Sequence, residues 1–184
     1  MSSQSSTVSA ISTRTLTIEQ KRVLLHRALA KNPQDSRVRE ALVGTFTPTL
    51  IQHATRHGVY VCYHRADEVF ALDISMSLHE ARVKVWMDEM DVPETADDWR
   101  GAVDAALHAC GTMLLVLSPD LVNDADVLNE YRRFIEAGKI VIPVLHRACD
   151  TSRLLLLLPV IDFRQSPAGG LHQLKTMLGA NAQV

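Results

Sequence analysis

The sequence predicts an α/β fold in which five parallel strands form one sheet with helices on both faces. Short apolar segments alternate with amphipathic ones from about Gly58 to about Gly179. Residues 113–117 are apolar at every position, as in a central strand that is covered on both faces. The chain has 184 residues, of which 47% are hydrophobic, enough for one sizeable core. Right-handed crossovers between five such strands favour the flavodoxin-like order 2-1-3-4-5.

Two segments precede the predicted domain, which spans residues 58–184. Residues 1–16 are rich in Ser and Thr and poor in large apolar side chains, so they are predicted to be a flexible tail. Residues 17–57 are interpreted as a helical hairpin. This hairpin is either a scaffold packed on the main domain or an adaptor that binds partners or forms oligomers.

The helices of the hairpin are predicted from capping and periodicity. Thr17 and Gln20 have the spacing of a capping box, which predicts a helix that ends at Asn32-Pro33. Apolar positions recur with helical spacing over residues 38–46, so a second helix is expected to stop before Pro48.

The later elements follow from their periodicity. Strands are expected at residues 59–63, 83–86, 113–117, 140–144 and 160–163. Helices are expected over residues 70–81, 99–110, 124–138 and 171–178. Thr95 and Asp98 have capping-box spacing ahead of the second of these helices.

Ligands of such a sheet bind beyond the carboxyl ends of the first and third strands, here residues 63–68 and 118–130. Glu130 follows Val127 by three residues and so borders the apolar stripe of its helix. A carboxylate in that place is costly unless it is paired or functional. The alternative interpretation is that Glu130 lies at the edge of the apolar stripe, where its charge reaches solvent or Arg133.

Tyr63, His64 and Arg65 place an aromatic ring, a titratable ring and a cation at the end of the first strand. Together they could hold a phosphate or a ribose. The alternatives are a surface ion pair for Arg65 and a loop position facing solvent for His64.

Charge and cysteine content narrow the class of partner. A net charge of -2 and a pI near 6.4 argue against nucleic-acid binding, which needs clustered cations. The cysteines at positions 62, 110 and 149 form no CxxC pair, which indicates a reducing, cytoplasmic location. No secretion signal and no apolar segment long enough for a bilayer are recognised, so membrane insertion is not expected.

Several known chemistries lack their motifs. There is no GxGxxG, no GxxxxGK[ST] and no GxSxG. The third strand ends in Leu117-Ser118-Pro119, without the acceptor Asp of a receiver domain. His53 and His57 have helical chelate spacing but no further ligand pattern, so neither a metal nor a cofactor is expected.

The motifs that remain resemble those of a TIR (Toll/interleukin-1 receptor) domain, in a bacterial-like version. They are VYVCY at 59–63, VWMD at 85–88, the helix at 99–106, VLSP at 116–119 and GKIVIPV at 138–144. The resemblance covers about two thirds of the chain. It implies a flavodoxin-like fold and one of two functions. The first is cleavage of NAD to nicotinamide and ADP-ribose or a cyclic ADP-ribose, activated by self-association in defence or stress signalling. The second is a non-catalytic scaffold that binds other TIR or adaptor proteins.

In the NAD-cleaving members an essential Glu lies on the helix after the third strand, which corresponds here to Glu130. NAD is then a substrate, and nicotinamide leaves as a neutral molecule without a general acid. The carboxylate stabilises the ribosyl cation that remains, which water or an adenine nitrogen attacks. The substrate-binding residues that the resemblance implies are His64, Arg65, Asp88, Ser118 and Asp126.

This chain departs from the family pattern in three places. Asp126 stands where the enzymes carry an aromatic residue, the gating loop at 88–98 has no Gly, and Cys62 replaces a common Ser. Trp86 and Trp99 lie in strand and helix patterns and are expected to pack in the core. A nucleoside glycosyl-transferring enzyme is a further alternative, because it would use the same carboxylate without NAD.

Overall fold

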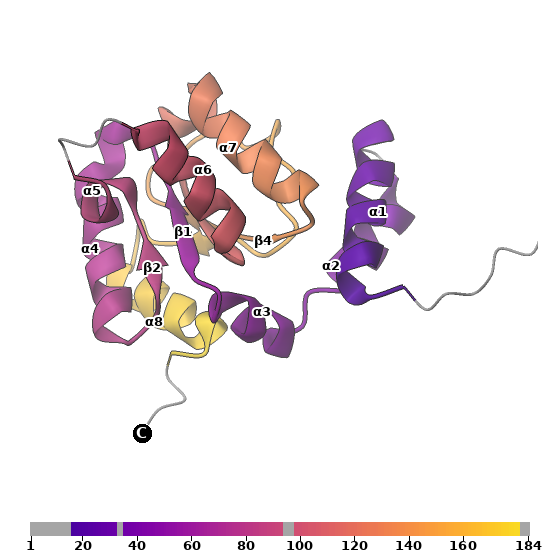
Figure 1. Ribbon diagram of the computed structural model, residues 1–184, viewed down its shortest axis with the longest axis horizontal. Coiled ribbons are helices and arrows are strands. Elements are labelled where there is room, and N and C mark those ends of the chain that lie inside the picture. Colours follow the sequence, from indigo (N-terminus) through magenta and orange to yellow (C-terminus); the bar gives the residue numbers. More distant parts are fainter. Residues whose placement is uncertain (1–15, 33–34, 94–97, 181–184) are drawn as a thin grey trace, which may run out of the picture.

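The computed structural model describes residues 16–32, 35–93 and 98–180 (Figure 1). Its helices are α1 (Ile18–Lys31), α2 (Ser36–Val43), α3 (Pro48–Thr55), α4 (Glu68–Glu80), α5 (Asp88–Asp91), α6 (Trp99–Ala109), α7 (Ala125–Glu136) and α8 (Pro167–Leu178). Its strands are β1 (Val59–Cys62), β2 (Val85–Trp86), β3 (Thr112–Leu117), β4 (Ile140–Leu145) and β5 (Ile161–Asp162). Thr95 and the tail predicted before Leu16 lie outside the described residues.

The strands pair in the order β2-β1-β3-β4-β5, and every pair is parallel, so the predicted topology is confirmed. The edge strands are shorter than predicted. β2 pairs with β1 only at Val85 and Trp86, so Val83 and Lys84 lie outside the strand. An edge strand pairs with a neighbouring strand on one side only. Its apolar residues can therefore be buried while their backbone forms a loop outside the hydrogen-bonded strand.

Side-chain alternation along β1 divides the core into two parts, one on each face of the sheet. Val59 and Val61 face the core that α3, α4 and α8 cover. Tyr60 and Cys62 face the core that α6 and α7 cover. The strand therefore directs Tyr60 and Cys62 toward the helix that carries Glu130.

The helical hairpin begins as predicted. The Thr17 hydroxyl accepts from the Gln20 amide at 3.2 Å, and the Gln20 side chain accepts from the Thr17 amide at 3.0 Å. α2 ends at Val43, so Phe46 lies beyond the helix that was expected to include it. Leu29 of α1 and Leu42 of α2 are buried together.

Two helices, α3 and the four-residue α5, were not expected as elements of their own. Pro48 ends the preceding segment as predicted and also opens α3, because its missing amide proton costs nothing in a first turn. The Thr47 hydroxyl caps this helix by accepting from the Leu50 amide at 3.2 Å. Ile51 of α3 joins the sheet's core, so part of segment 17–57 packs directly against the main domain.

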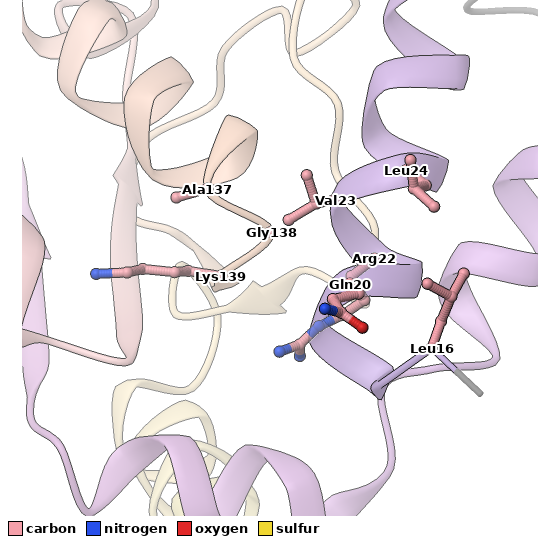
Figure 2. A pocket seen from close by; sticks show the side chains of 8 residues that line it. All are labelled: Leu16, Gln20, Arg22, Val23, Leu24, Ala137, Gly138 and Lys139. Atoms are coloured by element: carbon pink, nitrogen blue, oxygen red, sulfur yellow. The ribbon is translucent and has the colours of Figure 1, made fainter. Parts of the chain in front are cut away.

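Helix α1 lies against the turn between α7 and β4 (Figure 1). Gly138 in that turn has φ +71°, and a Cβ there would lie 2.9 Å from the Val23 side chain. A mostly apolar pocket, which Leu16 and Leu24 also line, opens beside this contact (Figure 2). Within residues 16–32, 35–93 and 98–180, no helix has the length and apolar character needed to cross a bilayer.

Candidate functional site

A cavity of about 220 Å³ opens beyond the carboxyl end of β1, beside the first half of α7. This is the crevice that the strand order predicts. Of the predicted site residues, those that line it are Glu130, His64, Arg65, Asp88 and Asp126. Ser118 does not line it. The remaining lining residues are Tyr60, Val61, Tyr63, Trp99, Asp124 and Val127.

Glu130 is half-buried in this cavity, and β1 supplies its neighbours. The Tyr60 phenol donates a hydrogen bond of 2.7 Å to Oε2 of Glu130. The Cys62 thiol lies 4.0 Å from the same oxygen and 3.9 Å from the Val127 carbonyl oxygen. Burial raises the pKa of Glu130, the hydrogen bond from Tyr60 opposes that rise, and the Asp88 charge adds to it. The carboxylate is thus desolvated but has a donor.

Tyr60 and Cys62 are donors because they stay protonated. Burial, followed by the charge of Glu130, raises the pKa of the Tyr60 phenol. The same two causes raise the pKa of the Cys62 thiol. Neither group can act as a base at neutral pH, so the ionisable group between them that accepts a proton is Glu130.

The opposite wall of the cavity is built on α5. The Tyr63 phenol donates a hydrogen bond of 2.7 Å to Oδ1 of Asp88, the first residue of that helix. Asp91 closes the same turn by accepting from the Met87 amide at 2.8 Å. The first part of the predicted gating loop is therefore a short helix anchored to Tyr63, the residue directly after β1, whereas residues 94–97 lie outside the described chain.

His64 and Arg65 lie at the mouth of the cavity beside acidic partners. Arg65 is 67% exposed and pairs with Glu68 at 3.2 Å and with Glu89 at 2.7 Å. Nε2 of His64 lies 3.7 Å from Asp124. An anionic ligand would have to exchange for these carboxylates to bind Arg65.

Ser118 belongs instead to an ion cluster around Asp67. Its buried hydroxyl donates a hydrogen bond of 2.5 Å to Asp67, and Arg147 donates to the same carboxylate at 2.9 and 2.6 Å. Arg147 also pairs with Asp120. This cluster ties together the segments that follow β1, β3 and β4. In the sequence, this cluster is indicated only by the charged residue that follows each of these strands, namely Asp67, Asp120 and Arg147.

One group in the described chain has metal-ligand geometry. Ligand atoms of His64, Asp67 and Asp120 lie within 4.8 Å of one another. The Asp67 carboxylate, however, already accepts from Ser118 and Arg147. Since the Arg147 guanidinium occupies the place that a cation would take, this arrangement fits an ion pair better than a metal.

The two tryptophans have different surroundings. Trp86 packs against the core below α6 and α7, and its ring stacks on Tyr60 at 5.0 Å. Trp99 is 45% exposed and lines the cavity, so the expectation that it packs in the core was wrong. Trp99 is the first residue of α6, and the helix buries its later residues Val103, Ala106 and Leu107 instead.

Comparisons with known proteins agree with this fold. A family profile described as TIR domain matches residues 59–175, more than half of the chain. No curated protein matches the sequence. A similar solved structure is the TIR domain of the Toll-related receptor TRR-2 from the lower metazoan Hydra magnipapillata, with 17% identity and a TM-score of 0.55 over 67% of this chain and 97% of that one. At that identity the likeness concerns the fold alone. The match of the family profile to more than half of the chain shows that this protein belongs to the TIR-domain family.

Proposed function

We propose that this TIR-domain protein is an NAD glycohydrolase of the bacterial-like type, which releases nicotinamide and leaves ADP-ribose or a cyclic ADP-ribose. The observation that carries the proposal is the half-buried Glu130 carboxylate, which accepts from Tyr60 at 2.7 Å in a cavity at the strand ends. NAD is the substrate, and the reaction needs no other cofactor. The protein acts in the cytoplasm and is activated by self-association.

The reaction breaks the bond between the ribose C1′ and the nicotinamide nitrogen. The electron pair of that bond neutralises the pyridinium, so the departing nicotinamide needs no proton. Positive charge develops on the ribose, and the Glu130 carboxylate stabilises it. Such a contact is stronger in a site that excludes water. Attack by water on C1′ gives ADP-ribose and one proton, whereas attack by an adenine nitrogen gives the cyclic product.

The charge of the cavity supports a cationic substrate. Asp88, Asp124 and Asp126 line it together with Glu130. These carboxylates favour a pyridinium over the neutral base of an ordinary nucleoside, which distinguishes this proposal from a nucleoside glycosyl-transferring enzyme. Arg65 at the mouth has the charge to contact the diphosphate, and the His64 ring beside it can donate a hydrogen bond to the same group.

Trp99 offers a surface on which a base can stack. Asp126 replaces the aromatic residue that the TIR resemblance expects, and Trp99 lines the same cavity from α6 with 45% of its surface exposed. An exposed indole face suits a planar nicotinamide or adenine ring.

A second candidate function is a non-catalytic scaffold that binds TIR or adaptor proteins. Met90, inside the predicted gating loop at 88–98, is 43% exposed, and Trp99, directly after that loop, is 45% exposed. Exposed apolar side chains at one place suit a contact between protein copies. The same contact would also serve an enzyme that is activated by self-association.

The test is nicotinamide release from NAD by the purified protein over a range of protein concentrations. Glu130→Gln should lower the rate by about 10²–10³, the loss typical of one group that stabilises transition-state charge. Glu136→Gln, an exposed change on the same helix, should keep the wild-type rate. Absence of nicotinamide at every protein concentration, or an unchanged rate in Glu130→Gln, would overturn the proposal. The first of these outcomes would favour the scaffold.

A further inference from the structure

We propose that Tyr60 is a positioning residue for Glu130, whose phenol fixes the carboxylate in one orientation and favours its ionised form. This role rests on the proposed function of the site. The TIR resemblance assigns no role to Tyr60, whose only difference from a phenylalanine is the hydroxyl oxygen. In the structure that oxygen donates to Glu130 at 2.7 Å.

The Tyr60 ring is held rigidly. It is 3% exposed and stacks on Trp86 with 5.0 Å between ring centroids and 11° between ring planes. Its strand, β1, pairs with β2 at Trp86 on one side and with β3 at Met113 on the other. The hydroxyl therefore has a fixed direction, and a fixed donor restricts the rotamers of the flexible Glu130 side chain.

The hydrogen bond from Tyr60 gives the two carboxylate oxygens of Glu130 different roles. Tyr60 donates to Oε2 of Glu130, and the Cys62 thiol lies 4.0 Å from the same oxygen. Within the described part of the chain, no protein hydrogen bond to Oε1 is found. Oε2 thus serves as the anchor, and Oε1 is the oxygen available to the ribose.

The groups around Glu130 shift its pKa in both directions. Burial and the charges of Asp88 and Asp124 raise its pKa, whereas Tyr60 and Arg133 lower it. Arg133 is committed to Asp104 at 2.7 Å on the outer face of the domain. Tyr60 is therefore the group in direct contact that favours the carboxylate, and without it a larger share of Glu130 would be protonated and unable to stabilise a cation.

The test variant is Tyr60→Phe, which keeps the ring and its stack on Trp86. At saturating NAD and neutral pH, kcat should fall about tenfold, the equivalent of one hydrogen bond to a charged group. KM should change little, since the bond is made to the protein and not to NAD. The acid limb of the pH profile of kcat should move to higher pH.

A second measurement does not depend on turnover. The carboxyl resonance of Glu130 in protein labelled with ¹³C-glutamate, assigned by its loss in Glu130→Gln, should titrate at higher pH in Tyr60→Phe than in wild type. If the wild type releases no nicotinamide, the proposed function fails and this titration still decides whether Tyr60 acts on Glu130.

Tyr131→Phe is the matched control. It removes a buried phenol from the residue next to Glu130, where the hydroxyl donates to the Leu155 carbonyl at 3.0 Å, away from the cavity. It should lower the melting temperature without moving the acid limb or the Glu130 titration. If Tyr60→Phe keeps the wild-type acid limb and titration, or changes them no more than Tyr131→Phe does, Tyr60 only packs and the proposal is wrong.

Discussion

Glu130 occupies a place that disfavours its own ionised form. Burial and the nearby Asp88 raise its pKa above the ordinary value of 4.5. The folded state therefore binds the Glu130 proton more tightly than the unfolded state does. The corresponding stability is fully present below pH 4.5 and is lost as the pH rises through the raised pKa. The ionised form of Glu130 thus costs stability at neutral pH.

We expect Glu130→Gln to melt at a higher temperature than wild type at pH 8, because the neutral amide removes this cost. The difference should shrink toward zero as the pH falls through the raised pKa of Glu130 toward 4.5. Melting curves of both proteins at a series of pH values provide the measurement. Glu136→Gln serves as the control, and a lower melting temperature for Glu130→Gln at pH 8 would mean that the Tyr60 hydrogen bond outweighs burial.

Trp99 is exposed enough to be changed without harm to the core. We expect Trp99→Ala to raise KM for NAD about tenfold, because stacking on an aromatic side chain contributes about 1–3 kcal/mol per base. Trp99→Phe should keep most of the affinity, and neither variant should lower the melting temperature by much, since Trp99 is 45% exposed. Steady-state kinetics measure the effect, and an unchanged KM in Trp99→Ala would show that the indole does not contact NAD.

At the scale of the elements, α1 carries a buried histidine. His26 is 3% exposed, and within the described residues neither ring nitrogen has a hydrogen-bond partner. Burial, followed by the charge of Arg22 one turn earlier, lowers the pKa of His26 to about 4. The folded state therefore holds this proton less tightly than the unfolded state, and the packing of α1 is sensitive to acid.

The stability that His26 contributes should be complete above pH 6.5 and lost as the pH falls from 6.5 toward about 4. The loss over that range is about 3 kcal/mol. His26→Leu should remove this pH dependence, as measured by urea unfolding at pH 7.5 and pH 4.5. His172→Gln, at an exposed position of α8, is the control, and an equal pH dependence in wild type and His26→Leu would contradict the assignment.

The helices of the segment at 17–57 show which structural features a local sequence pattern predicts and which it does not. The capping box of Thr17 and Gln20 predicts the start of α1 because both partners lie within one turn. Pro48, by contrast, predicts the end of the preceding segment. Only the tertiary structure, in which Ile51 packs against the sheet, shows that Pro48 is also the first residue of α3. Helices of eight residues such as α3 depend on tertiary contacts for their stability, so periodicity alone does not reveal them.

At the scale of the whole molecule, the ion cluster around Asp67 joins three strand ends. The Asp67 side chain has no exposed surface, whereas that of Arg147 is 40% exposed. Removing one partner leaves a buried carboxylate without its guanidinium, which is costly. Because the cluster holds the segment after β1 in place, it also supports His64 and Arg65 at the mouth of the cavity.

A double-mutant cycle of Asp67→Asn and Arg147→Gln should give a coupling energy of about 1–2 kcal/mol, less than for a fully buried pair because solvent screens Arg147. Denaturant unfolding of the four proteins measures it. The same cycle on Asp162 and Arg164, an exposed pair at 2.7 Å, should show little coupling. Equal coupling in the two cycles would mean that burial of Asp67 adds nothing.

The sequence by itself determined the order of the strands, the parallel sheet and the helix on which Glu130 lies. These follow from local periodicity, and the crossover rule turns them into a topology. Only the tertiary structure decided which side chains meet. Tyr60 and Glu130 are 70 residues apart and Asp67 and Arg147 are 80 apart, and their contacts depend on strand register and helix placement. Trp99 likewise lines the cavity because of where α6 begins above the sheet edge, which no apolar pattern specifies.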